Sequence, residues 1–161
     1  MDRVVMYDPA TNSWQQMAAM PTARVCHSAA VLDGKIYVSG GFTTSRDLSD
    51  AFDAYDPVTN TCATLASLSE ARADHASAAF NGKLYVFGGF TSSGDCLDLV
   101  EVYSPASNIW ARAAGMPSAT EDFVAVRFES QLRAECMHNK VYKKVDARSC
   151  LVMCLLDEAT L

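Results

Sequence analysis

The segments KIYVSGGFT at residues 35–43 and KLYVFGGFT at residues 83–91 decide the fold, because they are two copies of one unit set 48 residues apart. Laying residues 7–54 over residues 55–102 without a gap gives 21 identities in 48 positions. A third copy begins with YSPASNIW at Tyr103. A fixed period of 20–50 residues is typical of propellers and solenoids, so the chain is a repeat protein.

Each copy has the pattern of four short antiparallel strands. Asp33-Gly34 and Asn81-Gly82 stand two residues wide between apolar runs, which is the strongest short signal for a β-hairpin. The runs around Tyr55 and Tyr103 predict third strands, and the segments around Trp14 and Trp110 predict fourth strands. Four antiparallel strands with short links describe one blade of a β-propeller, so we expect an all-β fold.

The repeat resembles the kelch repeat. Its motif is a glycine pair that is followed, at a fixed spacing, by a tyrosine and then by a tryptophan. The matching residues here are Gly40, Gly41, Tyr55, Gly88, Gly89, Tyr103 and Trp110, with Tyr7 and Trp14 in the first copy. More narrowly, the segments look like those of kelch-like proteins, whose BTB and BACK domains precede a six-bladed propeller; these 161 residues hold neither.

Most motif residues have a structural interpretation. Tyrosines and tryptophans that recur once per copy are expected to pack between neighbouring blades. Cys62 replaces the tryptophan of the second copy, so that blade should pack less well. His27 and His75 recur at one blade position, which favours a structural hydrogen bond over metal binding or catalysis. A glycine pair lets neighbouring backbone approach closely where the strand ends.

The repeat is expected to end before the chain does. Positions 48 residues after Gly82, Tyr85, Gly88 and Gly89 hold none of those residue types, and all eight glycines and five prolines lie at or before Pro117. We therefore divide the chain into kelch repeats over residues 1–128 and an unrelated tail over 129–161. The repeats comprise a partial blade (1–26), two blades (27–74 and 75–122) and the start of a broken blade (123–128).

An incomplete propeller of about three blades follows from the length, because closed propellers use 4–8 blades. The first copy enters in the middle of a blade, which implies a longer parent chain upstream. An open arc exposes its flanks and a broken blade exposes a strand edge. We therefore expect self-association through the open blade edges.

Composition narrows the partners. A formal charge of -6 argues against nucleic acid. The longest apolar run, Leu151–Leu156, is too short to cross a membrane, and the first 20 residues lack a signal-peptide core. We expect a cytoplasmic protein with its six cysteines reduced. Cys136, His138, Cys150 and Cys154 are zinc-type ligands at poor spacing, so no metal or cofactor is predicted.

Two sets of loops are candidates for binding, one before the first strand of each blade and one after the glycine pair. The resemblance to kelch-like proteins implies that both sets line a pocket for a substrate degron. The first set would contribute an arginine, and the second set would contribute polar residues. These positions are Arg24, Arg72, Thr43, Thr44, Ser45, Arg46, Thr91, Ser92 and Ser93. An arginine fork would pair with carboxylates of an acidic peptide; alternatively, the two arginines brace the loop. The third copy has Thr120 at their position.

The resemblance implies a protein-interaction module that binds the target of a cullin-RING ubiquitin ligase, with cullin held by the BTB domain. Without that domain, the chain could bind a target without delivering it. A second interpretation is a cytoskeletal or scaffold protein that binds actin through the same rim. A third is an enzyme, since a few kelch propellers isomerise sugars or oxidise alcohols with copper. No cluster of catalytic side chains recurs outside the blade motif, so we expect no enzyme.

Overall fold

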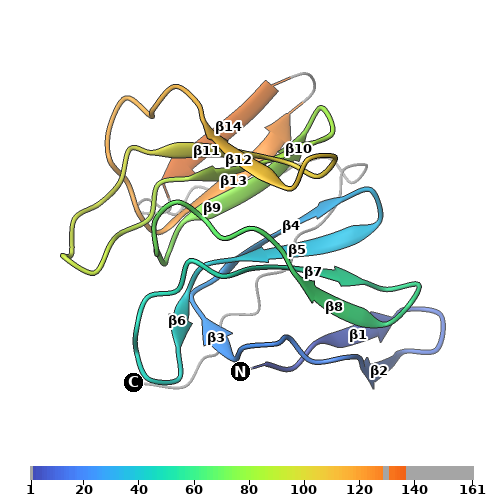
Figure 1. Cartoon of the computed structure of the whole chain (residues 1–161). Helices are drawn as coiled ribbons and strands as arrows, with labels where there is room; N and C mark the ends of the chain where they lie inside the picture. Colours follow the sequence, from blue (N-terminus) through green and yellow to red (C-terminus); the bar gives the residue numbers. More distant parts are fainter. Residues whose placement is uncertain (1, 129–130, 137–161) are drawn as a thin grey trace.

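Fourteen β-strands make up the fold in the computed structural model, which describes residues 2–128 and 131–136. Figure 1 shows the sheets following one another as an open arc in chain order. Within the described residues no helix is long and apolar enough to cross a membrane. The all-β prediction is confirmed.

Two complete blades occupy the centre of the chain, and each is a four-stranded antiparallel sheet. The first blade contains β4 (Ser28–Leu32), β5 (Lys35–Ser39), β7 (Phe52–Asp56) and β8 (Thr61–Thr64), and the second contains β9 (Ala76–Phe80), β10 (Lys83–Phe87), β11 (Val100–Ser104) and β12 (Ile109–Arg112). Two half-blades flank them, β1 (Val5–Asp8) with β2 (Ser13–Gln16), and β13 (Phe123–Phe128) with β14 (Gln131–Cys136). Short strands β3 (Arg24–Val25) and β6 (Phe42–Thr43) pair beside the first blade.

The predicted hairpin turns are present. Asp33 and Gly34 join β4 to β5 with φ of 50° and 75°, and Asn81 and Gly82 join β9 to β10 with φ of 49° and 70°. Two positive φ angles in succession define the type I′ turn, which suits glycine and, of the other residues, mainly asparagine and aspartate. These pairs thus fix the register of both hairpins.

The repeat persists further than its sequence does. The pair Ser28↔Ser39 of β4–β5 becomes Ala76↔Phe87 in β9–β10 and Val124↔Glu135 in β13–β14, each partner having moved by one repeat period at every step. The strand β14 falls in the segment 129–161 that the sequence analysis assigns to an unrelated tail, and the division at residue 128 stays a prediction. A β-hairpin forms when two strands with alternating polar and apolar residues pair in register across a turn. It does not require the residues to be identical to those of the other copies. Residues 129–130 and 137–161 lie outside the described residues.

Aromatic side chains fill the interface between the two complete blades. The Phe52 ring lies 4.7 Å from the Tyr103 ring and 4.8 Å from the Trp110 ring, measured between centroids, in edge-to-face contact. The indole N–H of Trp110 donates to the backbone oxygen of Ala66 in the first blade at 2.8 Å. This confirms the predicted packing role of Tyr103 and Trp110, and Tyr55 is likewise buried.

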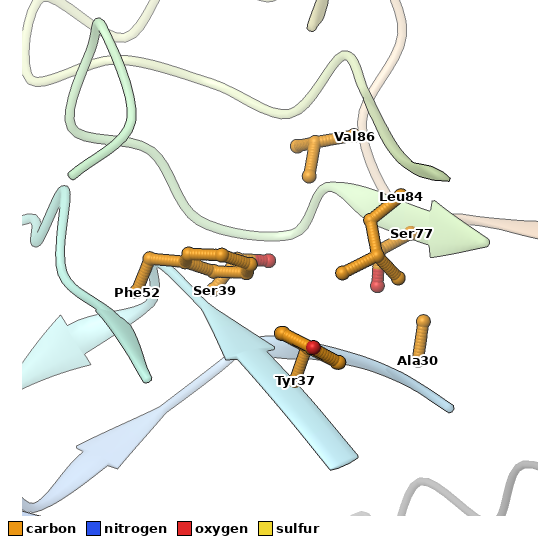
Figure 2. A pocket seen from close by; sticks show the side chains of 7 residues that line it. All are labelled: Ala30, Tyr37, Ser39, Phe52, Ser77, Leu84 and Val86. Carbon is orange, nitrogen blue, oxygen red and sulfur yellow. The ribbon is translucent and has the colours of Figure 1, made fainter. Parts of the chain in front are cut away.

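Figure 2 shows the seam between these sheets, in which Tyr37 and Phe52 of the first blade face Leu84 and Val86 of the second. The seam is apolar and too narrow to hold a water molecule. It is the core of the arc, and it offers no ligand site.

The equivalent residues of the first half-blade are in a different environment. Tyr7 is 44% exposed and Trp14 is 57% exposed, so the prediction that they pack between blades is wrong for this chain. Trp110 packs on the blade that precedes its own, and among the described residues no blade precedes β1 and β2. That Cys62 loosens the packing of its blade stays a prediction.

The glycine pair has a steric reason. A Cβ on Gly40 would lie 2.5 Å from the Arg72 carbonyl oxygen, and one on Gly89 would lie 2.5 Å from the Ala73 carbonyl oxygen. Both glycines also have positive φ, of 59° and 86°. The predicted close approach of neighbouring backbone is confirmed, and it places the loops after the glycine pairs against the segments that precede the next strands.

Candidate binding surface at the loop rim

The loops that follow the glycine pairs form one rim of the arc. In Figure 1 they extend to the left, whereas the short hairpin turns lie at the right. Residues 42–48 and 90–96 are held at their ends by bridges between Phe42 and Leu48 and between Phe90 and Cys96. The rings of Phe42 and Phe90 lie 5.6 Å apart, so the two loops are neighbours.

Each rim loop is a tight turn with the same backbone hydrogen bonds. The N–H groups of Thr43 and Thr91 donate to the carbonyls of Asp47 and Asp95, at 2.9 Å and 3.1 Å. At the tip, residue 46 or 94 donates back to the threonine carbonyl with positive φ, which is 66° for Arg46 and 84° for Gly94. The loops are thus preformed, although Arg46 occupies a conformation that favours glycine.

The predicted polar residues of these loops differ in exposure. Thr44, Ser45, Arg46, Ser92 and Ser93 are exposed, whereas Thr43 is half-buried. Thr91 is buried, and its hydroxyl hydrogen-bonds Ser93 at 2.7 Å, so the expectation that it lines a binding surface is wrong. The Ser93 hydroxyl in turn donates to Asp95 at 2.6 Å. The exposed set offers hydroxyls and one cation to a partner.

Arg24 and Arg72 lie in the interior instead of on the rim. Their side chains are 0% exposed and pair with Asp53 and Glu101, each at 2.5 Å. Arg24 also donates to the Ala51 carbonyl at 2.8 Å, and Arg72 donates to the Gly88 carbonyl at 3.2 Å. Burial lowers the pKa of both guanidinium groups, and the adjacent carboxylates oppose that effect.

This geometry contradicts the expectation that the two arginines offer their forks to an acidic peptide. Each fork already holds a carboxylate from the third strand and a carbonyl at the end of a neighbouring segment. The alternative interpretation, that the arginines brace the loops, fits the observed contacts. A ligand would have to displace a buried ion pair in order to reach either group.

Asp53 and Glu101 are the residues that sequence analysis missed. Besides the arginine, Asp53 accepts a hydrogen bond from Thr64 at 2.9 Å, and Glu101 accepts one from the Ser69 N–H at 3.1 Å. The sequence does contain a signal for this pairing. The two acids stand one repeat period apart, and each follows its arginine at the same separation. Acidic residues in otherwise apolar third strands demand a cationic partner.

Acidic side chains lie on the rim loops and on a segment paired with one of them. Burial and the charge of Asp122 raise the pKa of Asp74, which lies on the segment that pairs with the second rim loop. Burial, then the charge of Asp74, raises the pKa of the Cys26 thiol to about 11. Asp47 and Asp95 are exposed at the two loops themselves. The two loops thus expose the carboxylates of Asp47 and Asp95 against the single guanidinium of Arg46. The raised pKa of Cys26 means that its thiol is not an activated nucleophile.

Comparison with known proteins agrees with this architecture. The model of the KLHDC2/KLHL20/DRC7 kelch-repeats domain matches residues 1–132. The chain belongs to the kelch-repeat family. The kelch match ends at residue 132, inside β14.

Kelch-like proteins are among the relatives. Kelch-like protein 24 of Rattus norvegicus is 52% identical over 42 residues, which are 26% of this chain and 7% of that protein. Kelch-like protein 21 of Homo sapiens is 43% identical over 51 residues, 32% of this chain and 8% of that protein. Kelch-like protein 33 of Homo sapiens is 44% identical over 41 residues, 26% of this chain and 8% of that protein. The aligned kelch segments thus span less than a tenth of these relatives.

His75 has a structural contact in this arc. His75 is buried, and its Nε2 hydrogen-bonds the Ser39 hydroxyl at 2.7 Å. Burial, with the charge of Arg72, lowers the pKa of His75 to about 3. In the part of the chain that the structure describes, no three metal-ligating side chains come together. The weak zinc candidate falls mostly outside the described residues, at His138, Cys150 and Cys154.

Proposed function

We propose that the rim formed by residues 42–48 and 90–96 binds a polypeptide segment that carries basic side chains. The kelch repeat makes the chain a protein-interaction module. The observation that carries the finer proposal is the state of the charges: the two recurring arginines of the repeat are buried in ion pairs, while the rim exposes two carboxylates, Asp47 and Asp95, and one cation, Arg46. Complementary charge then favours a basic ligand over an acidic one.

The biological role that we propose for this surface is target recognition by a kelch-like adaptor of a cullin-RING ubiquitin ligase. The resemblance to kelch-like proteins supports this role, in which the cullin-binding BTB domain lies outside these 161 residues. The rim would select the target, and the remainder of a longer chain would deliver it.

A peptide array tests the ligand class. The labelled 161-residue chain is applied to short peptides that are basic, acidic or uncharged, and we expect retention on the basic set. The variant Asp47→Asn with Asp95→Asn should lose that retention. Its matched control, Val58→Lys with Ile109→Lys, adds the same charge at two exposed positions away from the rim and should bind like the native chain. Retention on the acidic set would contradict the proposal.

A chimera tests the ligase role separately. The chain is joined behind the BTB and BACK domains of a kelch-like relative, and cullin and ubiquitinated targets are recovered from cells. We expect the native chimera to recover both cullin and ubiquitinated targets. The chimera that carries the Asp47 and Asp95 variant should recover cullin without the targets. A failure to recover ubiquitinated targets with the native chimera would contradict the role, whereas targets unchanged by that variant would contradict the rim as the binding site. Sedimentation of the chain with actin filaments would instead support the cytoskeletal alternative.

A further inference from the structure

The two rim loops share one polar motif, which is a threonine, a serine and an aspartate at alternate positions. Its members are Thr43, Ser45 and Asp47 in the first loop (residues 42–48) and Thr91, Ser93 and Asp95 in the second loop (residues 90–96). The tip between the serine and the aspartate differs, because it is Arg46 in the first loop and Gly94 in the second. The structure shows that the shared side chains are also arranged differently.

In the second loop, the three motif side chains form one hydrogen-bonded chain. Ser93 donates to Asp95 Oδ2 at 2.6 Å, so the Ser93 oxygen accepts the hydrogen bond from the Thr91 hydroxyl at 2.7 Å. The chain runs from the buried Thr91 to the exposed Asp95. A carboxylate accepts hydrogen bonds on both of its oxygens. Asp95 is therefore held in one orientation while its Oδ1 stays open to a ligand.

In the first loop, the same side chains form no such chain. The Thr43 hydroxyl oxygen accepts a hydrogen bond from the Asp47 backbone N–H at 3.3 Å, so it is engaged with the backbone instead of with Ser45. Within residues 42–48 and the rest of the described chain, neither the Ser45 hydroxyl nor the Asp47 carboxylate has a hydrogen-bond partner. A ligand would have to order the Asp47 side chain, which costs free energy. Asp95 is thus the better prepared of the two acceptors.

A further carboxylate lies beside the second loop. The Gly89 N–H, directly before this loop, donates to the Thr120 carbonyl at 2.9 Å and so brings the neighbouring Glu121 to it. Desolvation, and then the charge of Glu121, raises the pKa of the Cys96 thiol at the end of the loop. One repeat period before Glu121 stands Ala73, which gives the first loop no such charge. The surroundings of the second loop therefore favour a cation.

The first loop carries a cation of its own. Arg46 is exposed at the tip, and it forms no ion pair within the part of the chain that the structure describes. Its φ of 66° is unfavourable for an arginine, whereas Gly94 adopts the equivalent conformation without strain. Backbone strain at an exposed position points to a function for its side chain. The tip of the first loop therefore favours an anion.

The two loops are close enough for one short segment to reach both. The rings of Phe42 and Phe90, which begin the two loops, lie 5.6 Å apart. An extended chain advances about 3.3 Å per residue, so neighbouring side chains of one peptide can contact both loops. The opposite preferences of the loops can thus act on a single ligand.

We propose that the ligand of this rim carries a basic side chain that is anchored on Asp95 and an acidic side chain that pairs with Arg46. Ser93 is a positioning residue that holds Asp95, and Thr91 holds Ser93 in turn. This inference rests on the proposed function of the rim, and it adds the polarity of the ligand and the residue that selects each end. Loops of unlike charge also favour one direction of the bound segment over the other.

Fluorescence anisotropy of a labelled basic peptide that the array retains measures the contribution of each loop. Asp95→Asn should lower its affinity about tenfold or more, because a charge-assisted hydrogen bond to a prepared acceptor is lost. Asp47→Asn, at the matched position, should lower it less than about fivefold, as expected for an exposed pair of mobile side chains. Equal losses would overturn the inference and leave the basic ligand class in place. Failure of every basic peptide to bind would overturn the proposed function and this inference with it.

A second set of variants tests the positioning role of Ser93. Ser93→Ala should lower the affinity by a smaller factor than Asp95→Asn, and Ser93→Thr should restore it because the hydroxyl is kept. Ser45→Ala, at the matched position, should lower the affinity less than Ser93→Ala does. Thermal melts of the same variants separate positioning from folding. A loss of affinity that follows a loss of melting temperature, or no rescue by threonine, would overturn this role.

A charge-reversal scan of the peptide tests its polarity. Each basic residue is replaced in turn by glutamate, and we expect one replacement to raise the affinity because that glutamate meets Arg46. Arg46→Gly should abolish this gain, and it should tighten binding of the parent basic peptide because a like charge leaves the surface. A scan in which every glutamate weakens binding, or a gain that persists in Arg46→Gly, would overturn the proposed polarity.

Discussion

The buried pair of Arg72 and Glu101 gives the sharpest stability prediction. In the variant Arg72→Met, Glu101 keeps the Ser69 N–H as its hydrogen-bond donor but loses its cation, and the Gly88 carbonyl loses its partner. Removing one member of a buried ion pair costs about 3–5 kcal/mol. That loss is a large share of the roughly 5–15 kcal/mol by which a domain is stable.

Two further variants show whether this loss of stability comes from the unpaired carboxylate. Arg72→Met with Glu101→Leu removes both charges, and we expect it to be no less stable than Arg72→Met alone, because no unpaired carboxylate remains buried. Lys35→Met is the matched surface control. Lys35 pairs with Asp56 at 3.2 Å, and the lysine side chain is 47% exposed, so its loss should cost less than about 1 kcal/mol.

Urea unfolding followed by circular dichroism, at one fixed protein concentration, measures all four free energies of unfolding. We expect a large loss of stability in Arg72→Met, a smaller or equal loss in the double variant and almost none in Lys35→Met. If Arg72→Met lowered the free energy of unfolding by no more than Lys35→Met does, the arginine would not brace the blade. Its place in a binding surface would then have to be reconsidered.

Three other perturbations follow from individual contacts. Gly40→Ala should lower the free energy of unfolding by more than Gly34→Ala, since both have positive φ but only the first Cβ meets backbone, and thermal melts of the two variants compare them. The pKa of His75 is about 3 in the folded chain and about 6.5 when the chain is unfolded. Below pH 6.5 the unfolded chain therefore binds one more proton than the folded chain. Stability should therefore be complete above pH 6.5 and fall by up to about 1.4 kcal/mol per pH unit towards pH 3; a slope that His75→Gln leaves unchanged would refute this. Arg46→Gly should stabilise the rim loop by up to about 1 kcal/mol, because φ is 66° there and the second copy already has Gly94; equal or lower melting temperature would argue against strain.

Much of the fold could be predicted because its signals are local. The Asp-Gly and Asn-Gly pairs specify their turns by backbone conformation alone, and the identities between successive copies carry that result from blade to blade. The third hairpin escaped prediction because β13–β14 keeps the register of the repeat without its glycines. Backbone pairing tolerates such changes as long as strand length and alternation are kept.

The site could be predicted only in part. The rim loops were located correctly from the glycine pairs, and five of the named polar residues are exposed there. The arginines were misplaced because a recurring arginine has the same pattern whether it faces a ligand or a buried acid. Whether these arginines are buried depends on a contact between distant parts of the sequence. That contact forms only when the third strand is folded against the loop.

Hydrogen exchange of the chain, free and bound to a basic peptide retained on the array, tests the central claim of a loop-rim interaction surface most directly. We expect slower exchange on binding for amides of residues 42–48 and 90–96, with the β7–β8 and β11–β12 hairpin turns unchanged. Protection confined to those outer hairpins, with the rim loops exchanging as in the free chain, would contradict it.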